Sequence, residues 1–228
     1  MISNRKLLLP YAAPYLAYVV IASALADFTS IEVNYMLRII AVVGLLVWAW
    51  KWYIPLTGPR SPVTSVVTGV LTGLLGTVIW VLLLLPMAET SETAPWSPAA
   101  FTLRLLSATL LVPVFEELIM RGFIFRLAYQ WGEARKNKVD QPLATVLDER
   151  SIDKTPSGAW SWTAVIVSTL VFTSGHHMSE WPASIAYGLL MCALLIVRKD
   201  LLCCIVAHAV TNLGLALYVL KTGNWYLW

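Results

Sequence analysis

Residues 99–130, AAFTLRLLSATLLVPVFEELIMRGFIFRLAYQ, form the stretch that decides the fold. This run is predominantly apolar and is longer than the about 20 residues that a membrane helix needs. At a rise of about 1.5 Å per residue, a straight helix of this length exceeds the thickness of one bilayer. We therefore expect either one steep or broken helix, or two segments that meet near Pro113.

The rest of the chain contains six more apolar stretches, each with the length of a membrane span. They are residues 8–26, 33–54, 63–87, 160–176, 181–198 and 201–220. The composition agrees, because 58% of the 228 residues are hydrophobic and 13% are charged, whereas soluble domains carry about 25% charged residues. Mean hydropathy is +0.71. The sequence predicts an all-α, polytopic transmembrane bundle of seven or eight spans, with residues 1–228 as a single integral membrane domain.

The basic residues are distributed unevenly over the loops that seven spans leave. One side receives the N-terminus, 51–62, 131–159 and 198–200; the other receives 27–32, 88–98, 177–180 and the C-terminal tail. The first side holds eleven Lys and Arg residues and the second holds only Lys221. Because basic loops stay in the cytoplasm, we expect a cytoplasmic N-terminus, a polar cytoplasmic loop at about 131–159 and an outer C-terminus. In a bacterium the membrane would be the inner one.

Three ionisable residues lie within six positions of the longest apolar run, where each would cost several kcal/mol unless paired or hydrated. Glu117 and Arg121 are four residues apart, so they share a helix face and can pair. Glu116 lies about 100° around the helix from Glu117. One carboxylate can therefore be held by the arginine while the other faces a cavity. A buried ion pair that only fixes helix packing is the alternative.

Two histidines lie in other apolar stretches, and each has a motif partner four positions away. His176 follows Phe172 by four positions, and His208 precedes Asn212 by four. A single histidine in such a helix is often a packing residue. Polar groups on three separate spans, however, can satisfy one another only in the interior of the bundle. We expect the glutamates and the histidines to converge there.

These three motifs together resemble the signature of the CPBP family of intramembrane proteases. The motifs are Glu116-Glu117-x-x-x-Arg121, Phe172-x-x-x-His176 and His208-x-x-x-Asn212. The family includes endopeptidases of the CAAX prenyl protease 2 type and relatives linked to bacteriocin immunity. The resemblance covers about residues 100–215, with the motifs within 113–213. It implies a protease that cleaves a membrane protein or peptide, with or without a lipid modification, in the bilayer. No nucleic-acid partner is expected.

Peptide hydrolysis requires an activated water, stabilisation of the oxyanion and a proton for the leaving amine. A desolvated carboxylate is a good base, and Glu116 fits this role, as the family pattern also implies. His176 and His208 would hold the water or accept its proton, and Asn212 would donate to the oxyanion. Substrate-binding or orienting roles fall to the remaining motif residues, which are Glu117, Arg121 and Phe172.

The need for a metal stays open at this point. Glu116, His176 and His208 would suit a catalytic zinc with one free position, but the sequence has no HExxH motif, so the soluble metalloprotease template does not apply. We favour a reaction without a cofactor and keep zinc as the alternative.

His177 directly follows His176 and points about 100° away from it on a helix, so only one of the two can serve the site. The family spacing selects His176, and His177 and Glu180 are assigned to the outer turn.

The predicted spans create a conflict of depth. His176 is expected near the outer end of its span, His208 two turns from the cytoplasmic end of its own, and Glu116 near mid-depth. They can meet only if helices are offset or partly unwound, as in transporters, which Gly175 and Pro182 would permit.

Two other classes of function fit the same intramembrane charges. A proton-coupled or ion-coupled transporter, or a channel subunit, also places Glu, Arg and His in a bundle interior. A non-catalytic binding or immunity protein could retain the same scaffold.

Overall fold

The computed structural model describes residues 2–87 and 95–228 and contains only helices and connecting segments over these ranges. The predicted all-α class is confirmed. The helices are α1 (Asn4–Ala24), α2 (Ile31–Ala49), α3 (Pro62–Leu84), α4 (Pro98–Leu106), α5 (Val112–Glu117), α6 (Phe125–Lys136), α7 (Pro142–Glu149), α8 (Trp162–Ser174), α9 (Trp181–Arg198) and α10 (Leu201–Thr222). Of the loop predicted at 88–98, residues 88–94 lie outside the described residues.

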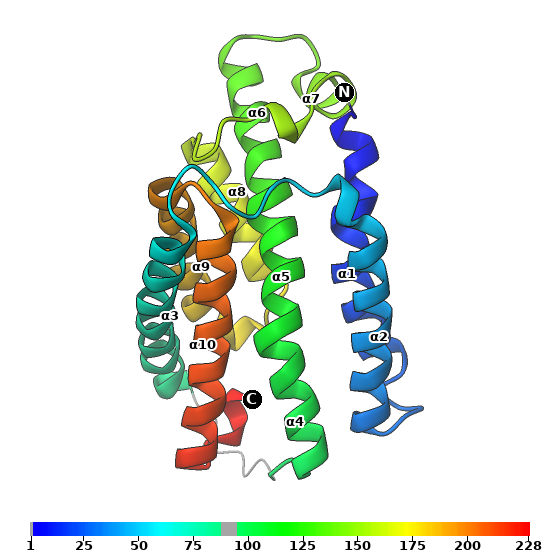
Figure 1. The fold of residues 1–228 in the computed structure, drawn as a ribbon, viewed down its shortest axis with the longest axis vertical. Coiled ribbons are helices and arrows are strands. Elements are labelled where there is room, and N and C mark those ends of the chain that lie inside the picture. The colour runs from blue at the N-terminus through cyan, green and yellow to red at the C-terminus, as the bar shows by residue number, and fades with distance from the viewer. Residues whose placement is uncertain (1, 88–94) are drawn as a thin grey trace.

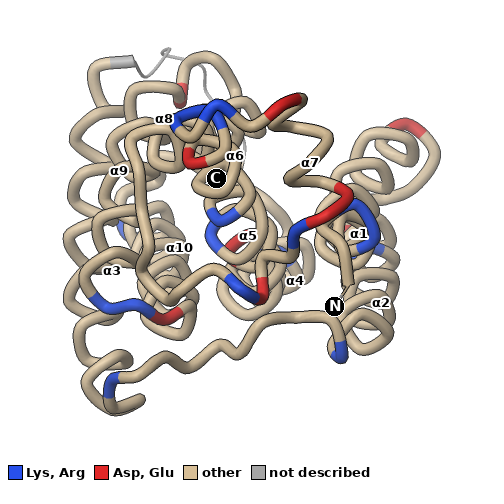
Figure 2. Tube along the Cα trace, turned by 90° about the horizontal axis from the view of Figure 1, so that it is seen from above, with Lys and Arg blue, Asp and Glu red and all other residues tan. Residues whose placement is uncertain are grey.

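The helices form a bundle built around the run from α4 to α6. Figure 1 shows α1 and α2 on one side of this run and α3, α9 and α10 on the other, with both α1 and α3 running antiparallel to it. Figure 2 shows the same arrangement from above, with charged residues on several of the connections at the end of the bundle that carries the N-terminus. Many large apolar side chains on the outward faces are exposed, such as Leu9, Val47 and Leu71, as expected for surfaces that face lipid.

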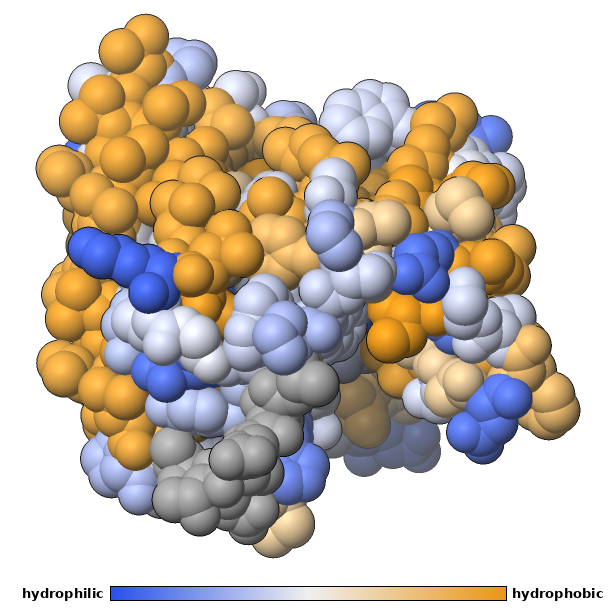
Figure 3. All heavy atoms as spheres, turned by 90° about the horizontal axis from the view of Figure 1, so that it is seen from below, coloured by the Kyte–Doolittle hydropathy of each residue, from blue (hydrophilic) through white to orange (hydrophobic). Residues whose placement is uncertain are grey.

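The end of the bundle opposite the N-terminus differs from its flanks. In Figure 3, apolar side chains cover much of the outer flank, while hydrophilic side chains gather toward the middle of this end. Apolar flanks with hydrophilic side chains at an end are the expected distribution for a bundle whose flanks face lipid and whose end faces water.

In the part of the chain that the structure describes, six helices are long and apolar enough to cross a membrane, and α8 is shorter. The prediction of a polytopic helical bundle is confirmed, but the span predicted at 160–176 needs correction. Helix α8 has 13 residues, which is about 20 Å and less than the about 30 Å of a hydrocarbon core. Residues 177–180, predicted on the outer side, instead form a turn within the height of the bundle (Figure 1).

The long stretch that decides the fold is one helical run from Pro98 to Lys136. The alternative of two segments meeting near Pro113, which gave eight spans, is therefore wrong. Two π-helical stretches, Ser107–Leu111 and Leu118–Ile124, interrupt the α-helical geometry without breaking the run. Wide turns of this kind often occur at functional sites, and these two stand on either side of Glu116.

Part of the polar region predicted at 131–159 is also helical, because α6 extends to Lys136 and α7 follows. The side chain of Asn4 ties this region to the start of the chain. It is fully buried, donates to Gln130 Oε1 at 2.7 Å and to Val146 O at 2.8 Å, and accepts from the Ile152 N–H at 2.6 Å. These bonds fix the polar region against α1 and α6.

Helices α3 and α10 approach closely because glycines of α3 face α10. Gly69 and Gly73 form the small-xxx-small spacing that allows helix backbones to touch in membranes. A β-carbon at Gly73 would lie 2.6 Å from Ala207 O. Thr211 uses this proximity, because its hydroxyl donates to Gly73 O at 3.0 Å. This contact fixes the height of α10, and with it the height of His208.

We expect Gly73→Ala to destabilise the protein by about 1–3 kcal/mol, because the added methyl group must displace the backbone of α10. Gly44→Ala is the matched control, since a β-carbon at Gly44 meets no atom within 4 Å and alanine is the better helix former by about 1 kcal/mol. Thermal unfolding in detergent, followed by circular dichroism, measures both. Equal stability of the two variants would contradict the assigned packing.

Candidate active site

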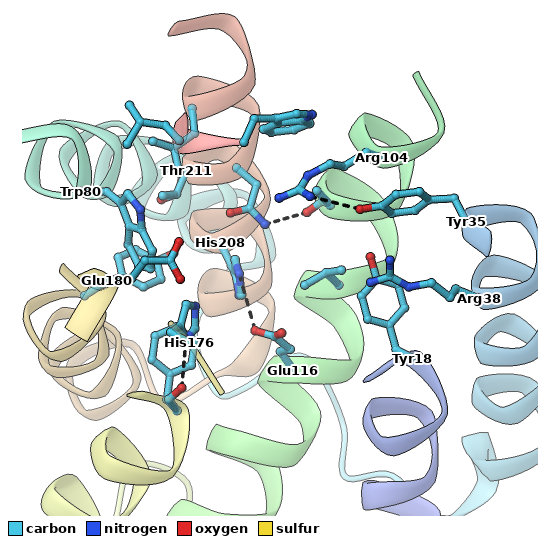
Figure 4. A pocket seen from close by; sticks show the side chains of 18 residues that line it. Tyr18, Tyr35, Arg38, Trp80, Arg104, Glu116, His176, Glu180, His208 and Thr211 are labelled. Carbon is cyan, nitrogen blue, oxygen red and sulfur yellow. Dashed lines mark hydrogen bonds and ion pairs between the residues drawn. The ribbon is translucent and has the colours of Figure 1, made fainter. Parts of the chain in front are cut away.

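The interior of the bundle contains a cavity of about 270 Å³ lined by residues from several helices. Five of the residues that the motifs singled out line it, namely Glu116, Phe172, His176, His208 and Asn212. They come from α5, α8, the turn after α8 and α10. Figure 4 shows the side chains of Glu116, His176 and His208 directed toward the same space. The structure thus brings these three distant stretches of chain together.

Glu117 lies behind this cavity, and its carboxylate accepts hydrogen bonds from two neighbouring side chains. Its Oε1 accepts from His208 Nδ1 at 2.9 Å and from Arg121 Nη1 at 3.2 Å. Glu117 and Arg121 have no exposed surface. The predicted pairing of Glu117 with Arg121 is present, and the contact to His208 is additional. Because neither side chain reaches the cavity, both act through the residues that they hold.

Arg121 also connects the site to two other helices. Its Nη2 donates to Gly188 O in α9 at 3.5 Å, and its guanidinium carbon lies 4.9 Å from the centre of the Phe172 ring in α8. The arginine therefore holds the helix run of α5 against α8 and α9. Phe172 is itself buried, and it lines the cavity beside the two histidines.

The bond to Glu117 fixes the protonation pattern of His208. A carboxylate can only accept, so Nδ1 carries the proton. In the neutral imidazole, Nε2 then keeps its lone pair. Nε2 lies 3.9 Å from Glu116 Oε2, too far for a direct hydrogen bond and suitable for a bridging water. Glu116 is partly exposed to the cavity, with 17% of its side chain accessible.

His176 is oriented in the same sense by the end of α8. The helix stops at Ser174, and His176 Nδ1 donates to Phe172 O at 3.0 Å, an acceptor that leaves Nε2 without the proton in the neutral ring. The Phe172 and Trp80 rings pack against the imidazole, with centroid distances of 4.6 Å and 5.4 Å. The sequence places His176, His208 and Glu116 at different depths, but in the structure they meet because α8 is short and the turn after it returns into the bundle.

Asn212 is held by the first π-helical stretch. Its Nδ2 donates to Ala108 O at 2.7 Å, which leaves the second amide hydrogen and Oδ1 for other partners. The side chain lines the cavity one helical turn beyond His208. The arrangement therefore offers a hydrogen-bond donor close to the two imidazoles.

His177 faces away from this cavity, as the spacing of the motif predicts. It is exposed, and its Nδ1 lies 2.8 Å from Ser179 Oγ in the turn. Glu180 accepts from the backbone N–H of His177 at 3.0 Å. Glu180 was assigned to the outer turn, but it also lines the cavity. Glu180 therefore belongs to this turn, as expected, and its position at the cavity is additional.

Several residues that line the cavity were not identified from the sequence. The hydroxyl of Tyr187 is buried and has no hydrogen-bond partner among the described residues. Arg38 and Arg104 also line the cavity, and both could have been found by the rule that selected Glu116, because a charge inside a span marks a functional site. Tyr187 and Trp80 carry no comparable signal, because aromatic residues are frequent in all the spans.

The residues considered for zinc do not form a metal-binding cluster in this geometry. Within residues 2–87 and 95–228, no group of three His, Cys, Asp or Glu side chains is placed to hold a metal ion. His176 packs against the rings of Trp80 and Phe172 and makes no ion pair with either glutamate.

The two adjacent glutamates should respond differently to neutralisation. We expect Glu117→Gln to destabilise the protein by about 3–5 kcal/mol, because it leaves the buried Arg121 charge without its counter-ion. Glu116→Gln is the matched control, since this side chain faces the cavity and makes no contact shorter than 3.9 Å to a charged group. Thermal unfolding in detergent compares them. A Glu116→Gln variant as unstable as Glu117→Gln would contradict this division.

Comparisons with known proteins identify the family of the chain. No curated protein and no solved structure matches the chain. A family model described as type II CAAX prenyl endopeptidase, Rce1-like, matches residues 98–214, which is just over half of the 228 residues and includes all three motifs. The resemblance that the motifs predicted is thereby confirmed: the chain belongs to the Rce1-like family of type II CAAX prenyl endopeptidases, a family of intramembrane proteases.

Proposed function

We propose that this protein is an endopeptidase that cleaves a membrane-associated protein or peptide with a water molecule activated by Glu116. The observation that carries the proposal is the meeting of one partly accessible carboxylate and two imidazoles in a single cavity inside an apolar bundle. Family membership supports the reaction class at a coarser level. The particular residues and their roles are inferred from their contacts.

Glu116 is the general base in this mechanism. A water between Glu116 Oε2 and His208 Nε2 can give its proton to the carboxylate while the imidazole orients it. The attack on the peptide carbonyl then forms a tetrahedral intermediate with a developing negative charge. After protonation of Glu116, the same carboxyl group can deliver the proton to the leaving amine. A lone pair on Nε2 is needed for this orientation, and the Nδ1 contact to Glu117 provides it.

The oxyanion requires donors that are already oriented when the charge develops. Asn212 meets this requirement, because its bond to Ala108 O fixes the amide plane while one N–H remains available. His176 has the second role of holding the water or the substrate amide through Nε2. Both imidazoles are held at Nδ1 by fixed acceptors, so neither needs to reorganise during the reaction.

Replacement of Glu116 should abolish proteolysis without loss of the fold. We expect Glu116→Ala and Glu116→Gln to lower cleavage by about 10²–10⁴-fold, the usual contribution of a general base. The measurement is mass spectrometry of peptide termini in membranes that contain the wild-type protein or the variant at equal abundance. His177→Ala is the control, because this histidine faces outward. Identical sets of termini for wild type and Glu116→Ala would refute the proposed role.

Activity should not depend on a bound metal ion, because the proposed base activates water directly. We expect the purified enzyme to retain its cleavage rate after treatment with EDTA and with 1,10-phenanthroline, measured on the substrate that the terminal analysis identifies. Loss of activity in chelator, restored only by zinc, would instead assign Glu116, His176 and His208 to a metal site.

A further inference from the structure

A second cavity, of about 420 Å³, lies at the end of the bundle that carries the N-terminus. Residues from the start of the chain, the segment 51–57 after α2, α6 and the segment 153–157 line it. Of the described residues, none lines both this cavity and that of Glu116. Figure 1 shows the segment after α2 crossing in front of the helical run from α4 to α6, and Figure 2 shows it along the edge of the bundle. The second cavity is therefore peripheral and separate from the candidate active site.

Aromatic side chains place this cavity at the level of the lipid headgroups. Trp52 and Tyr53 line it, and Trp48 and Trp50, which precede them, are exposed. Tryptophan and tyrosine gather where the hydrocarbon core of a bilayer meets the headgroups. Val47, one residue further into α2, is an exposed apolar side chain. A lipid whose chains lie along α2 would therefore bring its headgroup to the cavity.

Three charged side chains line this cavity, namely Lys51, Arg126 and Asp153. The ammonium group of Lys51 lies 4.3 Å from the centre of the Trp52 ring, a contact that leaves its charge in place. Within residues 2–87 and 95–228, none of the three forms an ion pair. Two positive charges and one negative charge give the lining a net charge of +1. The cavity is therefore suited to a ligand with one negative charge.

Hydrogen-bond donors accompany these charges. Arg126 Nη1 donates to the backbone carbonyls of Ile152 and Thr155 at 3.4 Å and 3.2 Å. A guanidinium carries five N–H groups in a planar fork, so those of Nε and Nη2 remain for a ligand. The hydroxyl groups of Thr57 and Ser157 line the same cavity and can also donate. Arginine, lysine and hydroxyl groups together match the oxygens of a phosphate group.

The position of the cavity in the membrane favours a lipid phosphate over a soluble one. The cavity lies at the end of the bundle with the basic loops, which is the cytoplasmic end by their charge. The cytoplasmic leaflet contains anionic lipids, and basic pockets between membrane helices on this side bind their headgroups. Phosphatidylglycerol carries one negative charge on its phosphodiester, and its glycerol hydroxyls can donate to a carboxylate such as that of Asp153.

We propose that this cavity binds the headgroup of an anionic phospholipid, with its phosphodiester between Lys51 and Arg126 and its hydroxyl groups at Asp153. The acyl chains lie along the exposed face of α2. Because the lining comes from the start of the chain, the segment after α2 and α6, the bound lipid holds the first two helices against the run that carries Glu116. This site goes beyond the proposed proteolytic function and does not depend on it.

The test is native mass spectrometry of the purified full chain in detergent, with phosphatidylglycerol or phosphatidylcholine of the same acyl chains. We expect wild type to bind phosphatidylglycerol about tenfold or more tightly, because phosphatidylcholine has no net charge and no hydroxyl donor. Lys51→Gln should weaken phosphatidylglycerol binding about fivefold, the contribution of one basic residue near an anionic membrane surface. Lys51 is exposed, so this variant should fold. Lys136→Gln, exposed on α6 and outside the cavity, is the matched control and should bind as wild type does.

Thermal unfolding in detergent provides a second measurement. Phosphatidylglycerol should raise the unfolding temperature of wild type more than that of Lys51→Gln, because a ligand of the folded state stabilises it. Equal affinity of wild type for the two lipids would overturn the site, as would equal losses in Lys51→Gln and Lys136→Gln. Displacement of phosphatidylglycerol by inorganic phosphate, but not by chloride at equal ionic strength, would assign the cavity to a soluble phosphate and overturn the lipid. None of these measurements involves proteolysis, so a failure of the protease assignment leaves their outcome unchanged.

Discussion

The buried carboxylate of Glu117 is the interaction on which the rest of this structure depends. One oxygen accepts from both His208 and Arg121, and through Arg121 it connects to the backbone of α9 and the aromatic ring of Phe172. In a bundle surrounded by lipid there is no water to replace these partners. The pairing therefore fixes the relative positions of the long central run, α8, α9 and α10. These helices in turn hold the residues that line the cavity.

Two departures from regular membrane helices bring Glu116, His176, His208 and Asn212 to one cavity. Helix α8 ends at Ser174, so the backbone carbonyl of Phe172 is free to orient His176 inside the bundle. The π-helical stretches in the central run rotate the residues that follow, and Ala108 in the first of them anchors Asn212. Both features need protein neighbours to satisfy the backbone groups that a regular helix would pair internally. Irregular backbone at membrane depth is tolerated where it lines a cavity, as it does here.

The sequence was sufficient to predict the helical class, the approximate spans and the residues that meet. Ionisable side chains in apolar spans can be accommodated only in the interior of the bundle, and this limits where they lie. It was insufficient for the ends of α8, since Trp160 to His176 reads as a span by composition while the inward turn depends on tertiary contacts. The contact of Glu117 with His208 was also missed, because the helix pattern shows only the partner four residues away, Arg121. Arg38 and Arg104 carried the same signal as Glu116 but belong to no family motif.

Arg38 and the motif residues also differ in where they lie along the chain. The family match begins at residue 98, and the groups proposed to activate water lie inside it. Arg38 lies before it, on α2, which contributes Tyr35 and Arg38 to the wall of the cavity. These two side chains take no part in the hydrogen bonds of Glu117, which run to His208 and Arg121, so the pairing that holds the central helices together does not depend on α2.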